Sequence, residues 1–203
     1  ENVIRPLIEQ YIASLPAKKG KMSNWVNVDD RPEGQVINHF TNKSETPKAI
    51  ARIYWYDTKT PYSLENDIKA SMLGQVLAKI YLQKIREDAG AAYSASARGY
   101  ASLNGDRPYT AVVAYCPMKP EMADVAVKIM NDEIVEACKN IDATTLKEIK
   151  ELMIKDHGTE LKENSYWMNT LIGYVTRGID DHTGYEDIIN AQTPETIAAF
   201  ARQ

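Results

Sequence analysis

The sequence predicts an α+β domain in which helices cover one face of an antiparallel sheet. Three observations predict it: a long amphipathic helix over residues 63–88, two pairs of strand-like segments flanking it, and helical segments filling most of the remainder. The chain has 203 residues, 44% of them hydrophobic, which is enough to bury a substantial core.

The chain begins with a segment of helical spacing. Residues 2–15 place Leu7, Ile8, Tyr11 and Ile12 on one side and end before a proline. Residues 17–31 contain three lysines and a glycine and indicate an exposed connector. An amphipathic helix at the very start of the sequence predicts a fragment of a longer polypeptide.

The first pair of predicted strands covers residues 35–40 and 49–56. The second of these alternates Ile50, Arg52, Tyr54 and Tyr56 with a more apolar set, as a half-buried strand does. The polar stretch between the two segments makes a hairpin plausible.

The helix over 63–88 is the element around which the chain is organised. Gly90 supplies its stop, and Arg86 falls in its last turn. Tyr93 is expected early in the strand that follows. The apolar stripe recurs at three- and four-residue steps and consists of Ile68, Met72, Leu73, Val76, Leu77, Ile80, Tyr81 and Ile85.

A second hairpin is predicted over residues 91–103 and 109–116, because Asn104-Gly105-Asp106 between them is a strong turn signal. Helical spacing then resumes over 119–139.

A third helical region runs over 142–177, with a predicted break at His157-Gly158. Near the end, Thr193 followed by Pro194 predicts a capped helix start.

Composition excludes several classes of function. The chain has 24 basic and 28 acidic residues and no basic block, so it lacks the electrostatic attraction that nucleic acids require. Its apolar runs are too short to predict a membrane span. Cys116 and Cys138 have no metal-ligand spacing and are expected to be buried free thiols.

No motif of known catalytic spacing is present. His157-Gly158-Thr159-Glu160-Leu161 comes near the His-x-x-Glu-His zinc motif but lacks its second histidine, so we expect no metal site in this chain. His39 and His182 lie in polar surroundings and are expected to be solvated. There is also no Gly-x-Ser-x-Gly elbow.

Arg86 and Tyr93 each have a structural interpretation. An arginine in the last turn is favourable against the negative end of the helix dipole. Tyr93 shares strand parity with Ala91, Ala95 and Ala97, so it could be a half-buried structural tyrosine. From the residues alone, structure is favoured over function.

A family resemblance changes that balance. The stretch Arg86-Glu87-Asp88-Ala89-Gly90-Ala91-Ala92-Tyr93-Ser94 resembles the Arg-(Glu)-x-x-Gly-x-x-Tyr-(Ser) signature of the second, non-zinc half of pitrilysin/insulinase zinc peptidases. Further phrases resemble bacterial members in the same order, at residues 6–11, 73–77, 164–167 and 193–195.

The resemblance implies a mitochondrial-processing-peptidase-like domain and a hydrolase, a zinc metalloendopeptidase, as the parent. Zinc is expected in the missing N-terminal half, with no cofactor in this fragment, which alone would be inactive. The partners implied are that zinc-bearing half and an unfolded peptide substrate. By the resemblance, Arg86 holds a substrate carbonyl and Tyr93 donates to the oxyanion.

The resemblance also divides the chain. Residues 1–31 would be the closing helix of a preceding domain plus a connector, and residues 32–203 a C-terminal, inactive domain for which the sequence predicts no last strand. The resemblance to bacterial members implies the periplasm or cell envelope as the location. The alternative is a non-catalytic scaffold or peptide-binding homologue, because some relatives have lost both functions.

Overall fold

The computed structural model describes residues 2–15, 31–43, 45–103 and 107–203, and the chain divides into two units, Glu1–Ile37 and Asn38–Gln203. In the first unit, α1 (Ile4–Tyr11) has no buried residue. Residues 16–30, which include most of the expected connector, lie outside the described residues. The second unit carries the sheet and the other helices.

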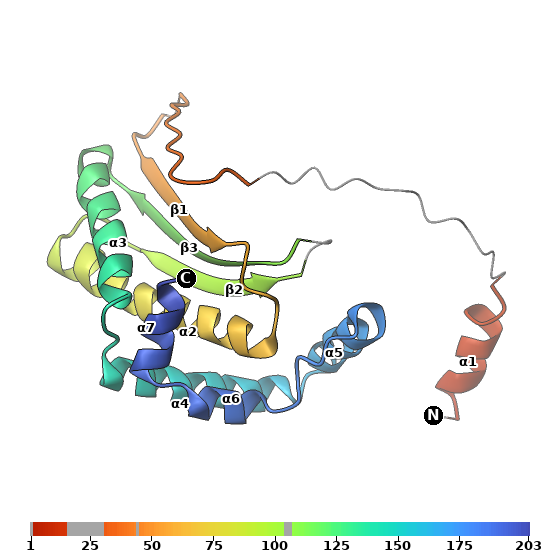
Figure 1. Cartoon of the computed structure of the whole chain (residues 1–203). Coiled ribbons are helices and arrows are strands. Elements are labelled where there is room, and N and C mark those ends of the chain that lie inside the picture. Colours follow the sequence, from red (N-terminus) through yellow and green to blue (C-terminus); the bar gives the residue numbers. More distant parts are fainter. Residues whose placement is uncertain (1, 16–30, 44, 104–106) are drawn as a thin grey trace. The chain divides into compact units, whose positions relative to one another are not determined.

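The sheet of the second unit has three antiparallel strands, β1 (Ala49–Asp57), β2 (Ser96–Ser102) and β3 (Tyr109–Met118), in the order β1-β3-β2 (Figure 1). β3 pairs with β2 over a short connection, from Ser102 opposite Tyr109, and with β1 from Ala49 opposite Met118. Helices cover one face of this sheet, which confirms the α+β prediction.

The first predicted hairpin is wrong. Residues 35–40 form no strand, and β1 pairs with β3 instead. Val36, Ile37 and Phe40 are all exposed, so this segment lacks both the partner strand and the burial that stabilise an extended apolar run.

The long helix α2 (Leu64–Tyr81) lies against β2, with backbones in close approach. A Cβ atom on Gly74 would overlap the backbone of Arg98 and Gly99, and one on Gly99 would overlap the carbonyl of Ala70. Small residues on both elements therefore set the distance between helix and strand. The predicted stripe is buried except at Ile80, which is partly buried, and Leu77 and Met72 are fully inaccessible to solvent.

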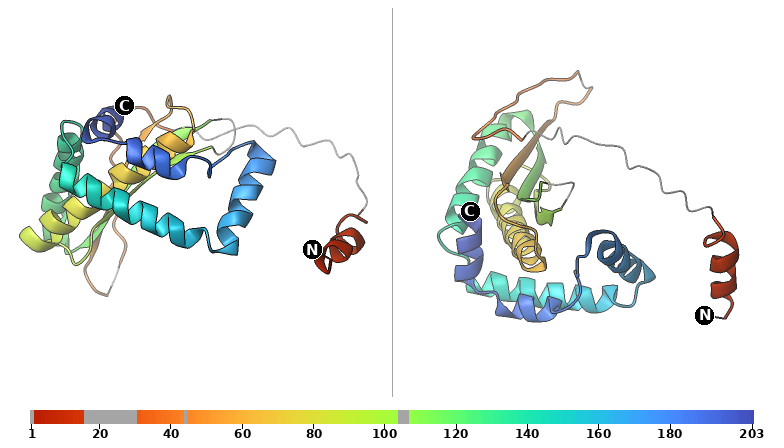
Figure 2. Two further views of the ribbon diagram at one scale, coloured as in Figure 1. Left: turned by 90° about the horizontal axis from the view of Figure 1, so that it is seen from below. Right: turned by 45° about the vertical axis from the view of Figure 1, so that its right-hand side comes forward.

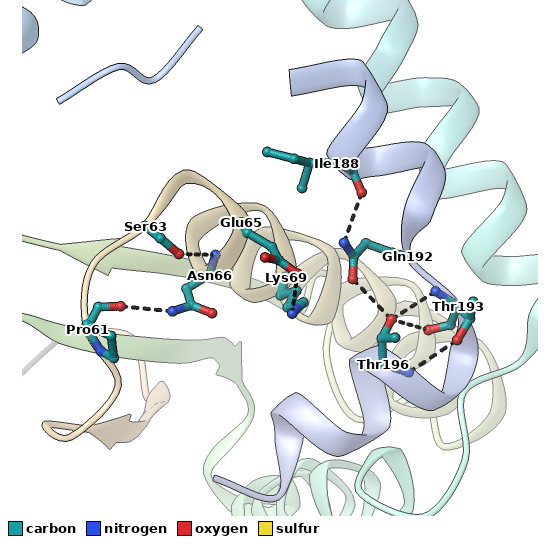
Figure 3. A network of polar contacts seen from close by, with 9 residues as sticks. All are labelled: Pro61, Ser63, Glu65, Asn66, Lys69, Ile188, Gln192, Thr193 and Thr196. Carbon is teal, nitrogen blue, oxygen red and sulfur yellow. Dashed lines mark hydrogen bonds and ion pairs between the residues drawn. The ribbon is translucent and has the colours of Figure 1, made fainter. Parts of the chain in front are cut away.

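Side chains cap the starts of two helices, α2 and the last helix of the chain (Figure 3). The Ser63 hydroxyl accepts from the Asn66 amide at 3.0 Å, as an N-cap does. At the start of α7 (Pro194–Ala201), the Thr193 and Thr196 side chains each accept from the other's backbone N–H. The predicted Thr193 cap is thus confirmed.

The remaining helices pack around α2, some of them on the sheet and some on the far side of α2. α3 (Ala123–Ala137), preceded by the short 3₁₀ turn η2 (Pro120–Met122), packs on the sheet beside α2. α4 (Ala143–Glu160) and α6 (Tyr185–Ala191) pack on α2, and α7 packs on both α2 and α3 (Figure 1). The predicted break at His157-Gly158 is wrong, since α4 continues to Glu160.

The helix α5 (Asn164–Arg177) differs from the others because Gly173 is its one buried residue among those the structure describes. It extends from the end of α4 away from the sheet (Figure 2). Its side chains at Met168, Leu171, Ile172 and Val175 form an exposed apolar stripe. None of the described helices is both long enough and apolar enough to cross a membrane.

Candidate functional site

The candidate site begins where α2 changes its winding. Residues Leu82–Asp88 form a π-helix, η1, in which Ile85 is fully buried. Such short π-helical segments are rare and are frequent at functional sites. Arg86 therefore lies in the last, widened turn of the long helical segment, next to a buried anchor.

Gly90 then redirects the chain. Its φ of 58° lies in the left-handed region, which a glycine adopts without cost, so the predicted stop is confirmed. The Ala91 amide donates to the Ile85 carbonyl at 2.9 Å, and Ala91 is buried. The Cys116 thiol contacts the Ser94 carbonyl at 3.7 Å. The segment that carries Tyr93 is thus held on both sides.

The structure brings Arg86 and Tyr93 together. The Arg86 guanidinium lies 5.2 Å from the centroid of the Tyr93 ring, a cation–π distance. The Arg86 side chain is 43% exposed, and its Nε lies 3.5 Å from the Glu87 carboxylate. An arginine held by a ring on one side and a carboxylate on another keeps its other N–H groups available.

Tyr93 is not the half-buried strand residue that parity suggested. β2 begins at Ser96, so Tyr93 lies in the preceding loop, and it is 86% exposed. Among the described residues, its hydroxyl has no hydrogen-bond partner. A donor presented in this way can meet an external acceptor.

The base of this segment is tied to α3. The Lys84 ammonium lies 2.6 Å from the Glu133 carboxylate, which is nearly buried. The Tyr81 hydroxyl donates to the Met130 carbonyl at 2.9 Å in the core. These contacts hold η1 against α3 and so fix the direction from which Arg86 is presented.

Neither thiol fits a nucleophile. Burial raises the pKa of Cys116 and also that of Cys138, so both stay protonated near neutral pH. Both are free, as expected, but Cys138 is only partly buried.

The sequence indicated three isolated histidines, but in the structure two of them, His157 and His182, lie close together. His157 is 4% exposed and stacks on Tyr185 at 4.2 Å between centroids, with His182 at 6.1 Å. The Tyr166 hydroxyl lies 2.9 Å from His182 Nδ1, so the expectation that His182 is simply solvated is wrong. His39 is exposed. Spacing along the chain could not reveal this cluster, because its members come from α4, α5, the loop before α6 and α6 itself.

This aromatic cluster does not form a metal site. In the described part of the chain, no three His, Cys, Asp or Glu side chains are placed to hold an ion. His157 is enclosed by rings and Glu160 is exposed, so they do not converge as zinc ligands would. Burial raises the pKa of Tyr185 to about 12, consistent with a structural role.

A shallow cavity of about 390 Å³ lies on the helical layer, away from Arg86. It is bordered by Lys150, whose ammonium donates to the carbonyls of Asn190 and Gln192 at 2.8 and 2.9 Å. Lys150 thereby stabilises the C-terminal end of α6. We therefore assign this cavity to the packing of the helices and not to the candidate site.

Comparison with known families identifies the domain. Residues 1–153 match the model described as Peptidase M16 inactive domain. The chain therefore belongs to the Peptidase M16 inactive domain family, and the resemblance to the non-zinc half of a peptidase is confirmed. Comparison with curated protein sequences gives no match.

Solved structures show the same fold. The periplasmic protease PqqL from Escherichia coli aligns with a TM-score of 0.66 at 22% identity, over 79% of this chain and 18% of that chain. A mutant of the ferredoxin protease FusC, in complex with Arabidopsis ferredoxin, gives 0.66 at 15% identity, over 98% and 22%. A conserved protein from Enterococcus faecalis V583 gives 0.70 at 19% identity, over 100% and 47%. The chain thus spans less than half the length of each of these proteins.

Proposed function

We propose that this domain is the substrate-clamping half of a zinc metallopeptidase and acts opposite a zinc-bearing half in the same polypeptide or in a partner subunit. One observation carries the proposal: the Arg86 guanidinium lies 5.2 Å from the Tyr93 ring on an anchored segment, and Tyr93 is exposed. Membership in the M16 inactive domain family supports it. The substrate proposed is an unfolded peptide.

In this proposal the two side chains have different tasks. Arg86 donates to a carbonyl of the bound peptide and fixes its register. Tyr93 donates to the carbonyl oxygen that becomes negatively charged when water adds to the scissile bond. A donor already in place at that oxygen stabilises the transition state by about 3 to 4 kcal/mol. Zinc, held by the other half, would supply the activated water.

The test for Tyr93 is its replacement by phenylalanine in the full-length parent. Because the proposed bond strengthens in the transition state, Tyr93→Phe should lower kcat and kcat/KM together, by about 100- to 1,000-fold. Thermal stability should hardly change, since the hydroxyl has no partner within the described residues. Tyr174→Phe, also exposed, is the matched control and should leave both constants unchanged.

The test for Arg86 separates binding from chemistry. A contact to a carbonyl away from the reacting atoms is made in the ground state too, so Arg86→Ala should raise KM more than it lowers kcat. Wild-type kcat in the Tyr93→Phe parent would overturn the catalytic assignment and leave the alternative, a non-catalytic scaffold or peptide-binding homologue.

We also propose that residues 1–31 close a preceding domain and that residues 32–203 form the clamping domain, and we place the parent in the periplasm or cell envelope. The similarity to PqqL, a periplasmic protease, supports this location. Osmotic-shock fractionation of cells that express the parent tests it: recovery with cytoplasmic markers would overturn the location.

A further inference from the structure

The face of the sheet that points away from α2 and α3 has an unusual composition. We call this the open sheet face, and alternation along the strands places on it Arg52, Tyr54, Arg98, Tyr100, Tyr109 and Tyr115. The opposite parity, with Val112, Ala114 and Cys116, belongs to the core. None of the side chains that these three strands direct to the open sheet face is acidic, although the chain has a net charge of −4.

The two arginines of this face rest on tyrosine rings. The Arg52 guanidinium lies 5.4 Å from the Tyr115 ring centroid, and its Nη1 lies 3.4 Å from the Tyr54 hydroxyl. The Arg98 guanidinium lies 5.7 Å from the Tyr100 ring centroid. Stacking orders a guanidinium but leaves its N–H groups free for an acceptor.

Neither arginine has an acidic partner among the described residues. Several other cations of the domain do have acidic partners, as Lys84 has Glu133 and Lys69 has Glu65. The open sheet face therefore presents two guanidiniums that are stacked on tyrosine rings and have no acidic partner among the described residues. Carboxylates are the acceptors that best match their planar geometry.

The register gives the spacing of the two charges. Arg52 lies opposite Tyr115, and Arg98 opposite Val113, on the two sides of β3. With strands about 4.8 Å apart and a rise of about 3.4 Å per residue, their Cα atoms are about 12 Å apart. Carboxylates three to four residues apart on an extended peptide have this spacing.

The position of the face relative to Arg86 and Tyr93 suggests how it is used. Ser96, the first residue of β2, lies opposite Tyr115, so the Arg52–Tyr115 pair is at the end of the sheet nearest Tyr93 in the chain. A peptide held at Tyr93 could continue along this face.

We propose that the open sheet face binds an extended, acidic segment of the peptide substrate, with carboxylates on Arg52 and Arg98 and other side chains on the tyrosines. This inference rests on the proposed function, since it extends the same substrate beyond the clamp.

The test measures binding of synthetic unstructured peptides to the 203-residue chain by isothermal titration calorimetry. One peptide carries glutamate at every fourth position, and its partner has glutamine there. The glutamate peptide should bind at least about 10-fold more tightly, and the preference should fall as salt is raised. The double variant Arg52→Gln/Arg98→Gln should lose the preference.

The matched control removes the same charge elsewhere. Lys147→Gln/Lys155→Gln changes two exposed lysines of α4, which packs on α2 rather than on the sheet, and should keep the preference. Arg52→Lys/Arg98→Lys should keep part of it, because charge remains while the planar fork is lost. Circular dichroism establishes that each variant is folded.

Equal binding of the two peptides, an equal loss in the control, or a preference that survives in Arg52→Gln/Arg98→Gln would each overturn the inference. Its failure is distinguishable from failure of the proposed function. If Tyr93→Phe lowers kcat in the parent but this chain shows no preference for the acidic peptide, only the proposal that the open sheet face binds acidic segments is refuted.

Discussion

Arg86 and Tyr93 are held by a contact that does not use the tyrosine hydroxyl. A cation–π contact orders both side chains through the ring face, so the hydrogen-bonding atom at the tip remains available. The Tyr81 hydroxyl, by contrast, is fixed by its own hydrogen bond to the Met130 carbonyl. Loss of the Tyr93 hydroxyl is therefore expected to change the free energy of unfolding less than loss of the Tyr81 hydroxyl.

Leu77 tests the core at the scale of one side chain. It is fully buried between α2 and the sheet, so Leu77→Ala should cost about 2 to 5 kcal/mol in the free energy of unfolding. Leu152→Ala makes the same chemical change at a site that is 48% exposed and should stay within about 0.5 kcal/mol. Urea unfolding measures both. Equal midpoints would mean that α2 does not pack as described.

Asp67 gives a pH-dependent prediction. Burial raises its pKa, although its carboxylate accepts from the Ala101 amide at 2.7 Å. Its contribution to stability is present below the unfolded pKa and is lost as pH rises through the raised folded value. Asp67→Asn keeps an acceptor and does not titrate, so the variant should gain stability over wild type as pH increases from about 3 to about 7.

Asp180 is the control of opposite sign. Backbone N–H groups of Thr183 and His182 donate to it and lower its pKa to about 2. Asp180→Asn should therefore lose stability relative to wild type near neutral pH, and the difference should vanish as pH falls through the lowered pKa. Parallel pH profiles for Asp67→Asn and Asp180→Asn would contradict both assignments.

Sequence reasoning at the residue scale proposed Arg86 and Tyr93 as site residues, which stays a prediction, and it did not give their environment. Whether Tyr93 is buried depends on where β2 begins, and pairing with β3 sets that start at Ser96. The histidine cluster was missed for a related reason: His157 and His182 are brought together by the turns after α4 and α5, which no local pattern encodes.

At the scale of elements, the contact between α2 and β2 depends on small residues. Gly74 and Gly99 have no room for a Cβ atom, so the helix and strand approach more closely than side chains would permit. Leu73 and Leu77, which lie on α2 next to Gly74 and one turn after Leu73 respectively, are both part of the buried core.

Substitution of Gly74 tests this contact. Gly74→Ala should destabilise the domain by about 1 to 3 kcal/mol, because overlap with the β2 backbone outweighs the better helix propensity of alanine. Gly158→Ala is the matched control: it lies in α4, a Cβ atom added there would have no neighbour within 4 Å, and it should stabilise by up to about 1 kcal/mol. Thermal unfolding compares them, and a stabilised Gly74→Ala would refute the close approach.

Helices were predicted better than strands because the two depend on different information. The stripe from Ile68 to Ile85 and the Thr193 cap are local signals, and both are found in the structure. Residues 35–40 carry a local strand pattern but have no partner strand, while β1 pairs with a strand far along the chain. The π-helical winding at Leu82–Asp88 also has no signal in the apolar spacing.

At the scale of the whole molecule, we predict how the chain behaves toward zinc and toward peptides when the proposed zinc-bearing half is absent. The segment His157-Gly158-Thr159-Glu160-Leu161 has a leucine where the zinc motif has its second histidine, so we expect the isolated chain to retain no stoichiometric zinc after dialysis and to hydrolyse no peptide. Metal analysis and a peptide-cleavage assay with and without chelator test this. Bound zinc together with chelator-sensitive turnover would refute the assignment to a non-zinc half.

The central position of β3 also has a kinetic consequence. β3 meets β2 across a short connection, whereas its pairing with β1 must close a loop that contains all of α2. Loop-closure entropy delays the more distant pairing, so β2, β3 and α2 should form the folding nucleus and β1 should join last. Ile53→Val in β1 should then speed unfolding and leave the refolding rate nearly unchanged, while Val112→Ala in β3 should slow refolding. The strand that docks last is also the first to detach, and its amide hydrogens should exchange with solvent before those of β2 and β3.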